Sequence, residues 1–336
     1  MIRAYEAREA GGRFHAIEYD PGPLGPDEIE IAVESCGLCH SDLSLLEDEW
    51  GVTRFPLTPG HEVVGRVAAA GERVSHLDAG QRVGVGWFSR SCLTCDPCMA
   101  GDHNMCPSVE MIAVGRRGGF ADRVRVQSSW ATPLPDALAP ADAGPLFCGG
   151  ITVFNPLVQF GVRPTDRVGV IGIGGLGHLA LQFMNAWGCE VTAFTSTDAK
   201  SEEAKSLGAH RTVNSRDRDA LKAEAGRYDL ILSTVAADMD WDVYLEMLGP
   251  RGRLHTVGLP PEPIPAPAFR LLGNQRSVSG SPLGSPATIR TMLEFCARHD
   301  IKPMVERLPL SRIDEAFERL RSGSPRYRIV LDNDFA

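Results

Sequence analysis

Apolar and polar positions alternate along the first part of the chain in the way that half-buried β-strands require. Residues 28–33, with the sequence EIEIAV, follow a period of two, which places one set of side chains on each face of a sheet. Similar short runs occur at residues 63–68, 82–85 and 124–126. Glycine and proline separate these runs, as in Pro59-Gly60, and indicate turns. The pattern predicts a mainly β-stranded region of about 150 residues.

A different pattern follows, because strand-like apolar runs now alternate with helical stretches. The strand-like runs lie at residues 167–171, 191–195, 230–234 and 254–257. The helical stretches between them lie at residues 178–186, 201–207 and 241–248. Alternation of this kind predicts a parallel sheet with helices on both faces. Beyond a proline-rich loop at 260–267, we expect helix again from about residue 285 and a last short strand at 327–331.

The length and charge of the chain limit its organisation and its partners. Its 336 residues exceed the size at which single hydrophobic cores usually stop growing, so we expect two domains. Lys and Arg total 34 against 43 Asp and Glu, and this net charge of −9 argues against nucleic acid or an anionic membrane as a partner. No apolar run has membrane-spanning length, and the first residues, MIRAYE, lack the apolar core of a signal peptide. We therefore expect a cytoplasmic protein.

The nine cysteines are too few for a disulfide scaffold of this length, and an odd number cannot all pair. In a reducing compartment, clustered cysteines bind metal more often than they bind each other. Four of them, Cys92, Cys95, Cys98 and Cys106, have the spacing C-x2-C-x2-C-x7-C. Four thiolates complete the tetrahedral shell of a structural zinc ion, which would stiffen this polar loop. An iron–sulfur cluster uses a similar shell, so the spacing alone leaves that alternative open.

A second set of metal-binding residue types is spread along the chain. Cys39 follows a predicted strand, His61 and Glu62 come about twenty residues later, and Cys148 precedes a pair of glycines. Each has an ordinary alternative explanation as a buried thiol or a packed histidine. Sequence spacing cannot show that such distant residues converge. If they do, two thiolates and one imidazole leave the fourth zinc position open, which is the arrangement of a catalytic site.

A glycine motif opens the βα region. Residues 168–178, VGVIGIGGLGH, contain G-x-G-x-x-G as Gly172, Gly174 and Gly177, after an apolar strand and before a helix. In that context Gly172 makes a tight turn, Gly174 lets a pyrophosphate approach, and Gly177 lets helix and strand pack closely. The helix N-terminus then supplies amide donors to the phosphates. A glycine-rich turn without a ligand is the alternative.

The end of the second βα strand bears on the choice between NAD and NADP. An NAD site needs a carboxylate there, bonded to the ribose 2′-hydroxyl, and the expected position is Thr195. Ser196 and Thr197 follow, and Lys200 comes shortly after them. Hydroxyls and a lysine can donate to a 2′-phosphate, whereas a carboxylate would repel it. These residues favour NADP, although serine and threonine at this point also serve as caps of the next helix.

These motifs occur together and in this order in the medium-chain, zinc-dependent alcohol dehydrogenase family, which the chain resembles along its whole length. Residues 60–74 match the zinc signature G-H-E-x2-G-x5-G-x2-V. Residues 172–178 and 195–197 resemble the NADP-dependent cinnamyl alcohol dehydrogenase branch, including its bacterial broad-range aldehyde reductases.

The resemblance implies an α/β protein in which a GroES-like, β-rich catalytic domain is joined to a Rossmann domain with a doubly wound parallel sheet. The catalytic domain would comprise residues 1–148, with the structural zinc lobe at about 90–107, and the C-terminal return at 285–336. The Rossmann domain would comprise residues 149–284 and bind NADP(H).

The resemblance also implies roles for individual residues. Cys39, His61 and Cys148 would bind the catalytic zinc, with Glu62 as an alternate ligand and Asp42 orienting His61. The implied cofactor contacts beyond Gly172, Gly174, Gly177 and Thr195 to Lys200 are Thr152, Gly175, Leu176, Val257, Gly258, Ser281, a pyrophosphate-binding Arg328 and a phosphate-facing His40. Trp50 and Trp87 match substrate-pocket positions, with core tryptophan as the alternative. The family favours a homodimer with two zinc ions per subunit.

The reaction implied is the interconversion of primary alcohols and aldehydes, aromatic or medium-chain aliphatic, with reduction favoured. Zinc would polarise the aldehyde as a Lewis acid, the nicotinamide would supply hydride, and Ser41 would pass a proton to the alkoxide. The family's proton relay usually ends on a histidine three residues later, where this chain has Ser44. Water or His40 would then finish the relay.

Two other functions remain open at this point. An NAD-dependent polyol or sugar dehydrogenase on the same scaffold predicts an acidic residue near Thr195 and a more polar pocket than Trp50 and Trp87 provide. A non-catalytic zinc and nucleotide-binding protein is disfavoured, because it has no need of an open metal site.

Overall fold

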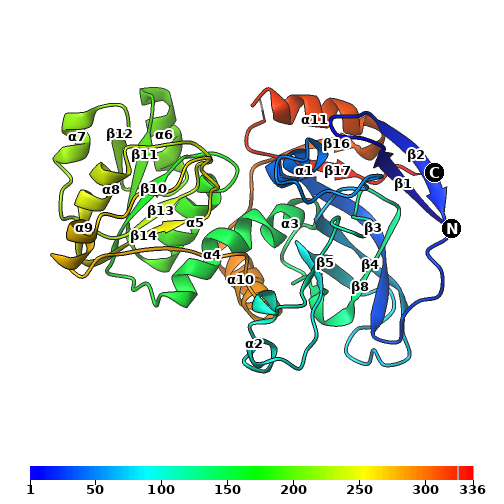
Figure 1. Ribbon diagram of the computed structural model, residues 1–336. Coiled ribbons are helices and arrows are strands. Elements are labelled where there is room, and N and C mark those ends of the chain that lie inside the picture. The colour runs from blue at the N-terminus through cyan, green and yellow to red at the C-terminus, as the bar shows by residue number, and fades with distance from the viewer. Residues whose placement is uncertain (324, 336) are drawn as a thin grey trace. The chain divides into compact units, whose positions relative to one another are not determined.

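The computed structural model describes residues 1–323 and 325–335, without the side chains of residues 198 and 199. By its contacts the chain divides into two compact units (Figure 1). The first consists of Met1–Ile151 with Leu283–Ala336, and the second of Thr152–Pro282. None of the helices in the described residues is both long enough and apolar enough to span a membrane.

The first unit is built on a seven-stranded sheet with the order β16-β17-β3-β4-β5-β9, in which β8 also pairs with β3. Its strands are β3 (Glu28–Leu38), β4 (Glu62–Ala70), β5 (Arg82–Val85), β8 (Arg123–Gln127), β9 (Thr132–Pro133), β16 (Val305–Pro309) and β17 (Arg328–Asp332). Two small sheets accompany it, β1 (Ile2–Ala7) with β2 (Phe14–Tyr19) and β6 (Phe88–Arg90) with β7 (Glu110–Met111). The runs expected at 28–33, 63–68, 82–85 and 124–126 all lie in strands, so that prediction is confirmed.

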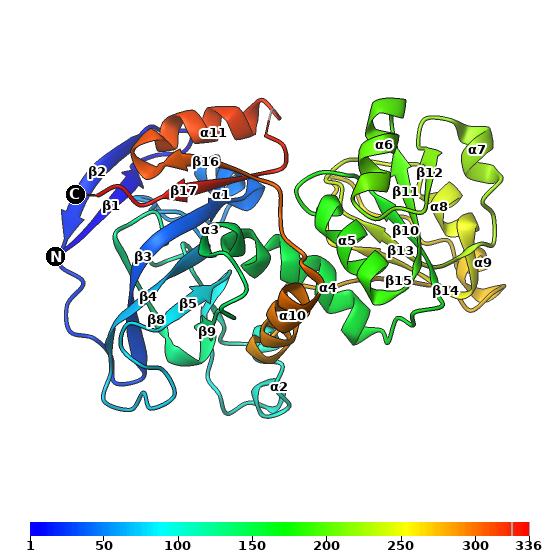
Figure 2. The same cartoon turned by 180° about the vertical axis from the view of Figure 1, so that it is seen from behind.

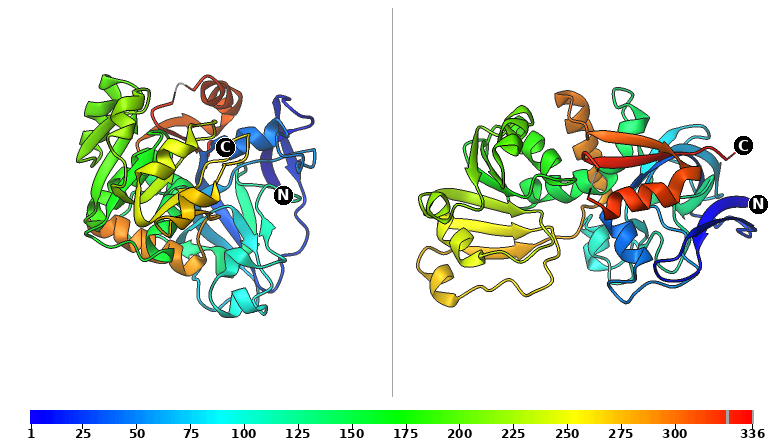
Figure 3. Two further views of the ribbon diagram at one scale, coloured as in Figure 1. Left: turned by 60° about the vertical axis from the view of Figure 1, so that its left-hand side comes forward. Right: turned by 90° about the horizontal axis from the view of Figure 1, so that it is seen from above.

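Strand β3 organises this sheet because three strands pair with it. Its antiparallel register with β4 places Gly37 opposite Glu62, and its antiparallel register with β17 places Leu38 opposite Ile329. The C-terminal strand therefore lies beside the end of β3 that leads to Cys39 (Figures 1 and 3). Side chains of β3 and β4 form the main core, to which Phe120 and Phe317 contribute an edge-to-face pair.

The alternation in β3 is not simply apolar inside and polar outside. Glu30 is buried although its place in the pattern predicts exposure. Strand β8 covers it, and its carboxylate accepts hydrogen bonds from Arg123 at 2.7 Å and from Arg125 at 2.9 Å. A buried carboxylate is tolerable when it is paired in this way.

Helices and short 3₁₀ turns complete the first unit. They are α1 (His40–Leu46), α2 (Asp96–Met99), η1 (His103–Met105), η2 (Ser128–Trp130), α3 (Pro140–Ala143), η3 (Gly144–Phe147), α10 (Pro286–His299), η4 (Leu310–Arg312) and α11 (Ile313–Arg321), while α4 (Gly149–Gln159) runs from this unit into the second. The expected helix after residue 285 and the last strand are both present.

The second unit is a six-stranded parallel sheet with the order β12-β11-β10-β13-β14-β15. The elements run in chain order as β10 (Arg167–Ile171), α5 (Gly177–Trp187), β11 (Glu190–Thr195), α6 (Asp198–Ser206), β12 (Arg211–Asn214), α7 (Arg218–Lys222), β13 (Tyr228–Ser233), α8 (Trp241–Met247), β14 (Leu248–Thr256), α9 (Ala268–Leu272) and β15 (Ser277–Gly280). Figures 1 and 2 view this sheet from its two sides, with α8 in front in the first and α5 and α6 in front in the second. The order reverses between β10 and β13, which is the doubly wound arrangement expected from the sequence.

Candidate active site

Four metal-binding side chains converge in the first unit. One ligand atom each from Cys39, His61, Glu62 and Cys148 lies within 4.8 Å of all the others, and all four residues are buried. The two sulfur atoms are 3.8 Å apart, and His61 Nε2 lies 3.3 Å from Cys148 Sγ. The chain elements explain this convergence. Cys39 is the N-cap of α1, Glu62 opens β4 next to it, and Cys148 ends η3.

Asp42 holds two of these residues in place. Its Oδ1 atom lies 3.0 Å from His61 Nδ1 and also accepts the Gly60 amide at 2.9 Å. Its Oδ2 atom accepts the Cys39 amide at 3.0 Å. Burial alone would lower the pKa of His61, but the Asp42 carboxylate outweighs it and raises that pKa well above its usual value. With Nδ1 bonded to a carboxylate, Nε2 is the nitrogen that faces the cysteines, as metal-ligating histidines require.

The two thiols need a cation between them. The hydrogen bond from Cys148, and after it the charge of Arg328, hold the pKa of Cys39 well below that of an ordinary thiol. The bond to Cys39 and burial raise the pKa of Cys148 well above that value. Without a cation only one of two buried sulfurs this close can be a thiolate, whereas zinc deprotonates both. The donor set therefore fits a zinc ion.

Glu62 pairs with an arginine from the far end of the chain. Arg328 Nη2 donates to Glu62 Oε1, and Arg328 Nη1 lies 3.9 Å from Cys39 Sγ. Burial raises the pKa of Glu62 to about 7 even though Arg328 lowers it. The other carboxylate oxygen, Oε2, is buried without a hydrogen-bond partner. A spare carboxylate oxygen beside the cysteines suits a residue that can approach a metal ion.

Two tryptophans lie next to this group. The Trp87 ring stands edge-on to the His61 ring, with centroids 4.8 Å apart at 85°, and Trp50 contacts Trp87 at 6.1 Å and 72°. Trp50 is 37 % exposed, while Trp87 is partly buried and also packs against the core of the unit. Trp87 therefore contributes to the core and also borders the candidate metal site.

The hydroxyls of helix α1 have distinct partners. Ser41 Oγ lies 3.8 Å from Cys39 Sγ, so it is next to the metal-binding group. Ser44 is buried and donates to Glu49 Oε2 at 2.6 Å. His40 is exposed at the start of the helix. Ser44, which stands where the family has its relay histidine, therefore donates its hydroxyl to the Glu49 carboxylate.

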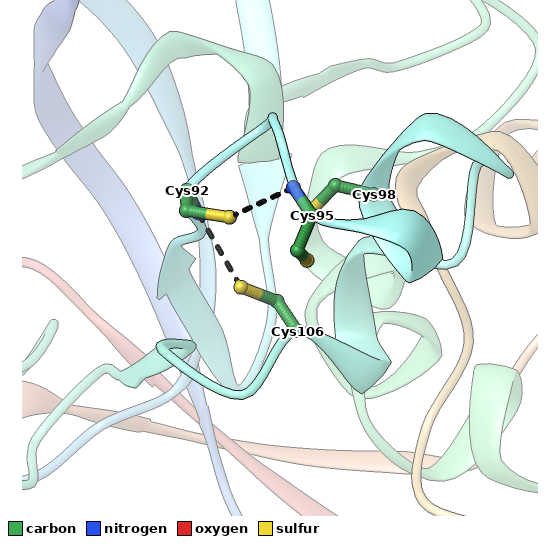
Figure 4. A group of neighbouring side chains, drawn as sticks. All are labelled: Cys92, Cys95, Cys98 and Cys106. Atoms are coloured by element: carbon green, nitrogen blue, oxygen red, sulfur yellow. Dashed lines mark hydrogen bonds between the residues drawn. The ribbon is translucent and has the colours of Figure 1, made fainter.

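A second cysteine group lies in the loop around α2 and η1. Ligand atoms of Cys92, Cys95, Cys98 and Cys106 lie within 4.8 Å of one another (Figure 4). The Cys95 amide donates to Cys92 Sγ at 3.3 Å, and the amides of Cys92 and Ser108 donate to Cys106 Sγ at 3.4 Å. Amide donors of this kind stabilise thiolates. All nine cysteines are free thiols, so no disulfide competes with metal binding.

The glycine motif lies at the carboxyl end of β10 in the second unit. Gly172 has a φ of 85°, which favours glycine, and a Cβ at Gly177 would overlap the Gly172 carbonyl oxygen. A Cβ at Gly174 would meet nothing within 4 Å. His178 Nδ1 lies 3.0 Å from the Gly174 carbonyl oxygen and helps to fix the turn. Gly175 and Leu176 complete the loop, which leads directly into α5.

The end of β11 combines a cap with exposed polar groups. Thr197 is the N-cap of α6 and accepts the Lys200 amide at 3.4 Å, so the capping role is confirmed. Thr195 is buried, with its hydroxyl 3.2 Å from Ser201 Oγ, whereas Ser196 is partly exposed and Lys200 exposed. At the ends of β13 and β14, farther along the sheet, the amides of Val257 and Gly258 donate to the Ser233 carbonyl. Ser281 Oγ lies 3.0 Å from His255 Nε2, and Thr152 is buried in α4.

Comparison with known proteins places these sites in a family. Residues 25–136 match the model of the alcohol dehydrogenase GroES-like domain, and residues 175–298 match that of the zinc-binding dehydrogenase. An aldehyde reductase, AdhA, of Synechocystis sp. is 53% identical over 333 residues, which are 99% of each chain. The chain belongs to the zinc-binding, medium-chain alcohol dehydrogenase family.

Solved structures of this alcohol dehydrogenase family share the whole fold. A cinnamyl alcohol dehydrogenase of Sorghum bicolor has a TM-score of 0.93 and 35% identity, covering 98% of this chain and 97% of its own. The cinnamyl alcohol dehydrogenase of Helicobacter pylori, solved with NADP(H), has a TM-score of 0.90 and 29% identity with the same coverage. The family, the GroES-like plus Rossmann fold and an enzymatic, zinc-binding role are confirmed, which removes the non-catalytic alternative.

Four contacts in this alcohol dehydrogenase were not predicted from its sequence. They are the pairing of Arg328 with Glu62, the bond from Ser44 to Glu49, and the contacts of His255 with two serines. Arg328 was expected to bind pyrophosphate, and its guanidinium here lies against Glu62. No local sequence pattern predicts this pairing, because 266 positions separate the two residues.

Proposed function

We propose that this protein is an NADP(H)-dependent aldehyde reductase that interconverts primary alcohols, aromatic or medium-chain aliphatic, and their aldehydes. One observation carries the proposal. Cys39, His61 and Cys148 converge with Asp42 behind the histidine, and three ligands of this kind leave the fourth zinc position open for an oxygen atom. The relatives named as an aldehyde reductase and as cinnamyl alcohol dehydrogenases support the substrate class.

Bound zinc supplies Lewis-acid polarisation of the carbonyl, and the nicotinamide supplies hydride. The chain's own residues prepare the site. Asp42 keeps His61 Nε2 available as a ligand, and the pairing of Arg328 with Glu62 adds no net charge beside two thiolates. Trp50 and Trp87 provide an aromatic wall next to His61 that suits an apolar substrate. In the four-cysteine lobe, Cys92, Cys95, Cys98 and Cys106 would hold the structural zinc.

The domain bounds that we propose are 1–148 with 285–336 for the catalytic domain and 149–284 for the cofactor domain. In the latter, Gly172, Gly174 and Gly177 with the intervening Gly175 and Leu176 would cradle the pyrophosphate. Thr152, Val257, Gly258 and Ser281 would face the nicotinamide, and His40 and Arg328 would contribute at the phosphates.

We propose NADP(H) as the cofactor because Thr195, the last residue of β11, is not acidic, and the nearest carboxylate in the sequence, Asp198, comes only beyond the strand end. Thr195 occupies the place where an NAD site has its acidic residue, and Ser196, Thr197 and Lys200 follow it. We expect initial rates with a panel of aldehydes to show kcat/KM at least about tenfold higher with NADPH than with NADH, because charge-assisted bonds to a phosphate contribute about 1.5–3 kcal/mol.

The Lys200→Ala variant is expected to remove most of that preference, because NADPH should bind more weakly and NADH binding should be unchanged. Lys205→Ala is the matched control, because Lys205 lies on the same helix and pairs with Glu202 at 2.7 Å. A wild-type preference for NADH would overturn the cofactor assignment and favour the NAD-dependent polyol dehydrogenase.

Ser41 is the proposed proton donor to the product alkoxide, since its hydroxyl lies beside Cys39. Ser41→Ala should lower turnover by about a hundredfold, the lower range for loss of a positioned acid or base. Ser44→Ala should lower it less, because the Ser44 hydroxyl is directed at Glu49. Metal analysis should find both zinc ions in each variant. Unchanged turnover in Ser41→Ala would refute the role.

We further propose a cytoplasmic homodimer. The nine free thiols suit a reducing compartment. In the second unit, β15 is an edge strand, and the exposed Leu259, Phe269 and Leu272 lie in the segment between β14 and β15. Unpaired strand edges and exposed apolar side chains are typical of subunit interfaces. Sedimentation at the mass of a single 36.3 kDa chain, with no change in Phe269→Asp, would contradict the dimer.

A further inference from the structure

One buried histidine of the second unit has no role in the function described so far. His255 lies in β14 with no exposed surface, and both of its ring nitrogens have partners. Nδ1 is 2.9 Å from Ser279 Oγ, and Nε2 is 3.0 Å from Ser281 Oγ. Ser279 is its register partner in β15, and Ser281 lies just beyond the end of that strand. One side chain thus connects the two outermost strands of the sheet on this side.

The surroundings of the ring favour its neutral form. Burial, with a smaller contribution from the charge of Arg253, lowers the pKa of His255 to about 4. A neutral imidazole has one N–H donor and one acceptor nitrogen, so one serine hydroxyl accepts a bond and the other donates one. Phe160 packs against the ring with centroids 5.0 Å apart at 63°, and the Arg253 guanidinium covers Phe160 at 4.0 Å.

The connection lies where a doubly wound sheet binds its ligand. His255 is followed at once by Thr256, Val257 and Gly258, at the carboxyl end of β14. Ser281 is at the carboxyl end of β15, and ligands of such sheets bind outside the carboxyl ends of the strands. Strand β15, with the sequence SVSG, has little apolar surface to fix it. Hydrogen bonds from His255 supplement its single ladder with β14.

We propose that His255 is a positioning residue for the nicotinamide half of the cofactor, because it fixes Ser281 relative to Val257 and Gly258 at the neighbouring strand end. The inference rests on the proposed function, in which these three residues face the nicotinamide. His255 itself is buried behind them and acts through Ser281. In the proposed function the adenine half of the cofactor would bind at the end of β11, where Thr195 and Lys200 lie, so its binding should not depend on this connection.

Calorimetric titration of two ligands tests the proposal. In His255→Leu we expect NADPH to bind about tenfold more weakly, because Ser281 loses the hydrogen bond that fixes it beside the nicotinamide. Binding of 2′,5′-ADP, which lacks the nicotinamide, should be unchanged. Steady-state kinetics should show a lower kcat with little change in the aldehyde KM. His255→Gln, whose amide reaches toward Ser281 as Nε2 does, should restore part of the NADPH affinity.

Serine variants separate positioning from a structural effect. Ser281→Ala should weaken NADPH binding as His255→Leu does. The double variant should bind NADPH no more weakly than either single variant, because both changes break the same connection. Ser277→Ala, on the same strand, is the matched control and should have no effect, since both nitrogens of His255 are taken by other serines. If His255→Leu fails to fold, Ser281→Ala decides the outcome.

Two results would overturn the proposal. One is wild-type NADPH affinity and kcat in His255→Leu or, if that variant does not fold, in Ser281→Ala. The other is an equal loss of affinity for NADPH and for 2′,5′-ADP together with a lowered Tm, which would show that His255 stabilises the sheet as a whole. Failure of the proposed function gives a different result, because the wild-type protein would then bind NADPH no better than 2′,5′-ADP and reduce no aldehyde.

Discussion

Cys39→Ala is expected to lower aldehyde-reduction turnover by about a thousandfold or more and to reduce bound zinc from two ions per chain to one. Lewis-acid stabilisation of the developing alkoxide is worth several kcal/mol, and each 1.4 kcal/mol is a factor of about ten in rate. The Cys39 sulfur also lies 3.8 Å from Ser41 Oγ and 3.9 Å from Arg328 Nη1. Metal analysis with initial rates measures both effects.

NADPH affinity should survive the loss of this zinc, because the glycine loop belongs to the other compact unit. Calorimetry on the same preparation therefore distinguishes a lost metal from a lost fold. Cys148→Ala should behave in the same way as Cys39→Ala, since its sulfur lies 3.8 Å from that of Cys39 and 3.3 Å from His61 Nε2.

Cys36→Ala is the matched control for these variants. Cys36 is an equally buried thiol three residues away, but its sulfur bonds to the Gly37 carbonyl and does not belong to the converging group. This variant should keep two zinc ions and most of its turnover, at a cost in stability of roughly 1 kcal/mol for the small cavity. Two bound zinc ions in Cys39→Ala would show that the catalytic metal is held elsewhere.

The glycine loop gives the second large expected effect. Gly174→Ala should fold normally and bind NADPH roughly a hundredfold more weakly. An added Cβ at this position meets no protein atom within 4 Å, so the fold has no reason to change. The methyl group would instead occupy the space that the pyrophosphate needs, and overpacking with lost amide contacts costs roughly 3 kcal/mol.

Gly177→Ala should behave differently. Its Cβ would overlap the Gly172 carbonyl oxygen, so the start of α5 has to shift and the protein should lose stability as well as cofactor affinity. Thermal unfolding alongside NADPH titration measures the difference between the two variants. Unaltered NADPH binding in Gly174→Ala would contradict the placement of the pyrophosphate at this loop.

Features that depend on neighbours in the chain were predictable from the sequence. The four-cysteine spacing and the glycine motif both join residues that lie within a single loop or turn, so their geometry follows from local backbone conformation. The main strands also followed from periodicity. The strands that were not predicted all lie in two-stranded sheets or at the edge of a larger sheet, where the apolar pattern is weaker: β1, β2, β6, β7, β9, β12, β15 and β16.

The zinc site itself depends on register and topology. Cys39 and Cys148 are 109 positions apart, and Arg328 lies 289 positions from Cys39. Pairing of β3 with β4 and with β17 brings Glu62 and Arg328 to Cys39, and η3, which leads to Cys148, packs against β3 and β4. That arrangement depends on which apolar faces pack into one core. Local sequence patterns do not reveal such long-range pairing. The prediction that Cys39, His61 and Cys148 converge therefore rested on the family resemblance alone.

Short-range spacing in the sequence determined the four-cysteine group and the loop that receives a dinucleotide. The class of enzyme and the catalytic zinc ligands followed from the resemblance of the whole set of motifs to a family. Only the tertiary structure decided that Glu62 pairs with Arg328 and that His255 joins Ser279 to Ser281, whereas the contact of Asp42 with His61 was already implied by the family resemblance. These contacts arise when strands from distant parts of the chain align in one sheet, where burial makes an unpaired polar group costly and selects the partner.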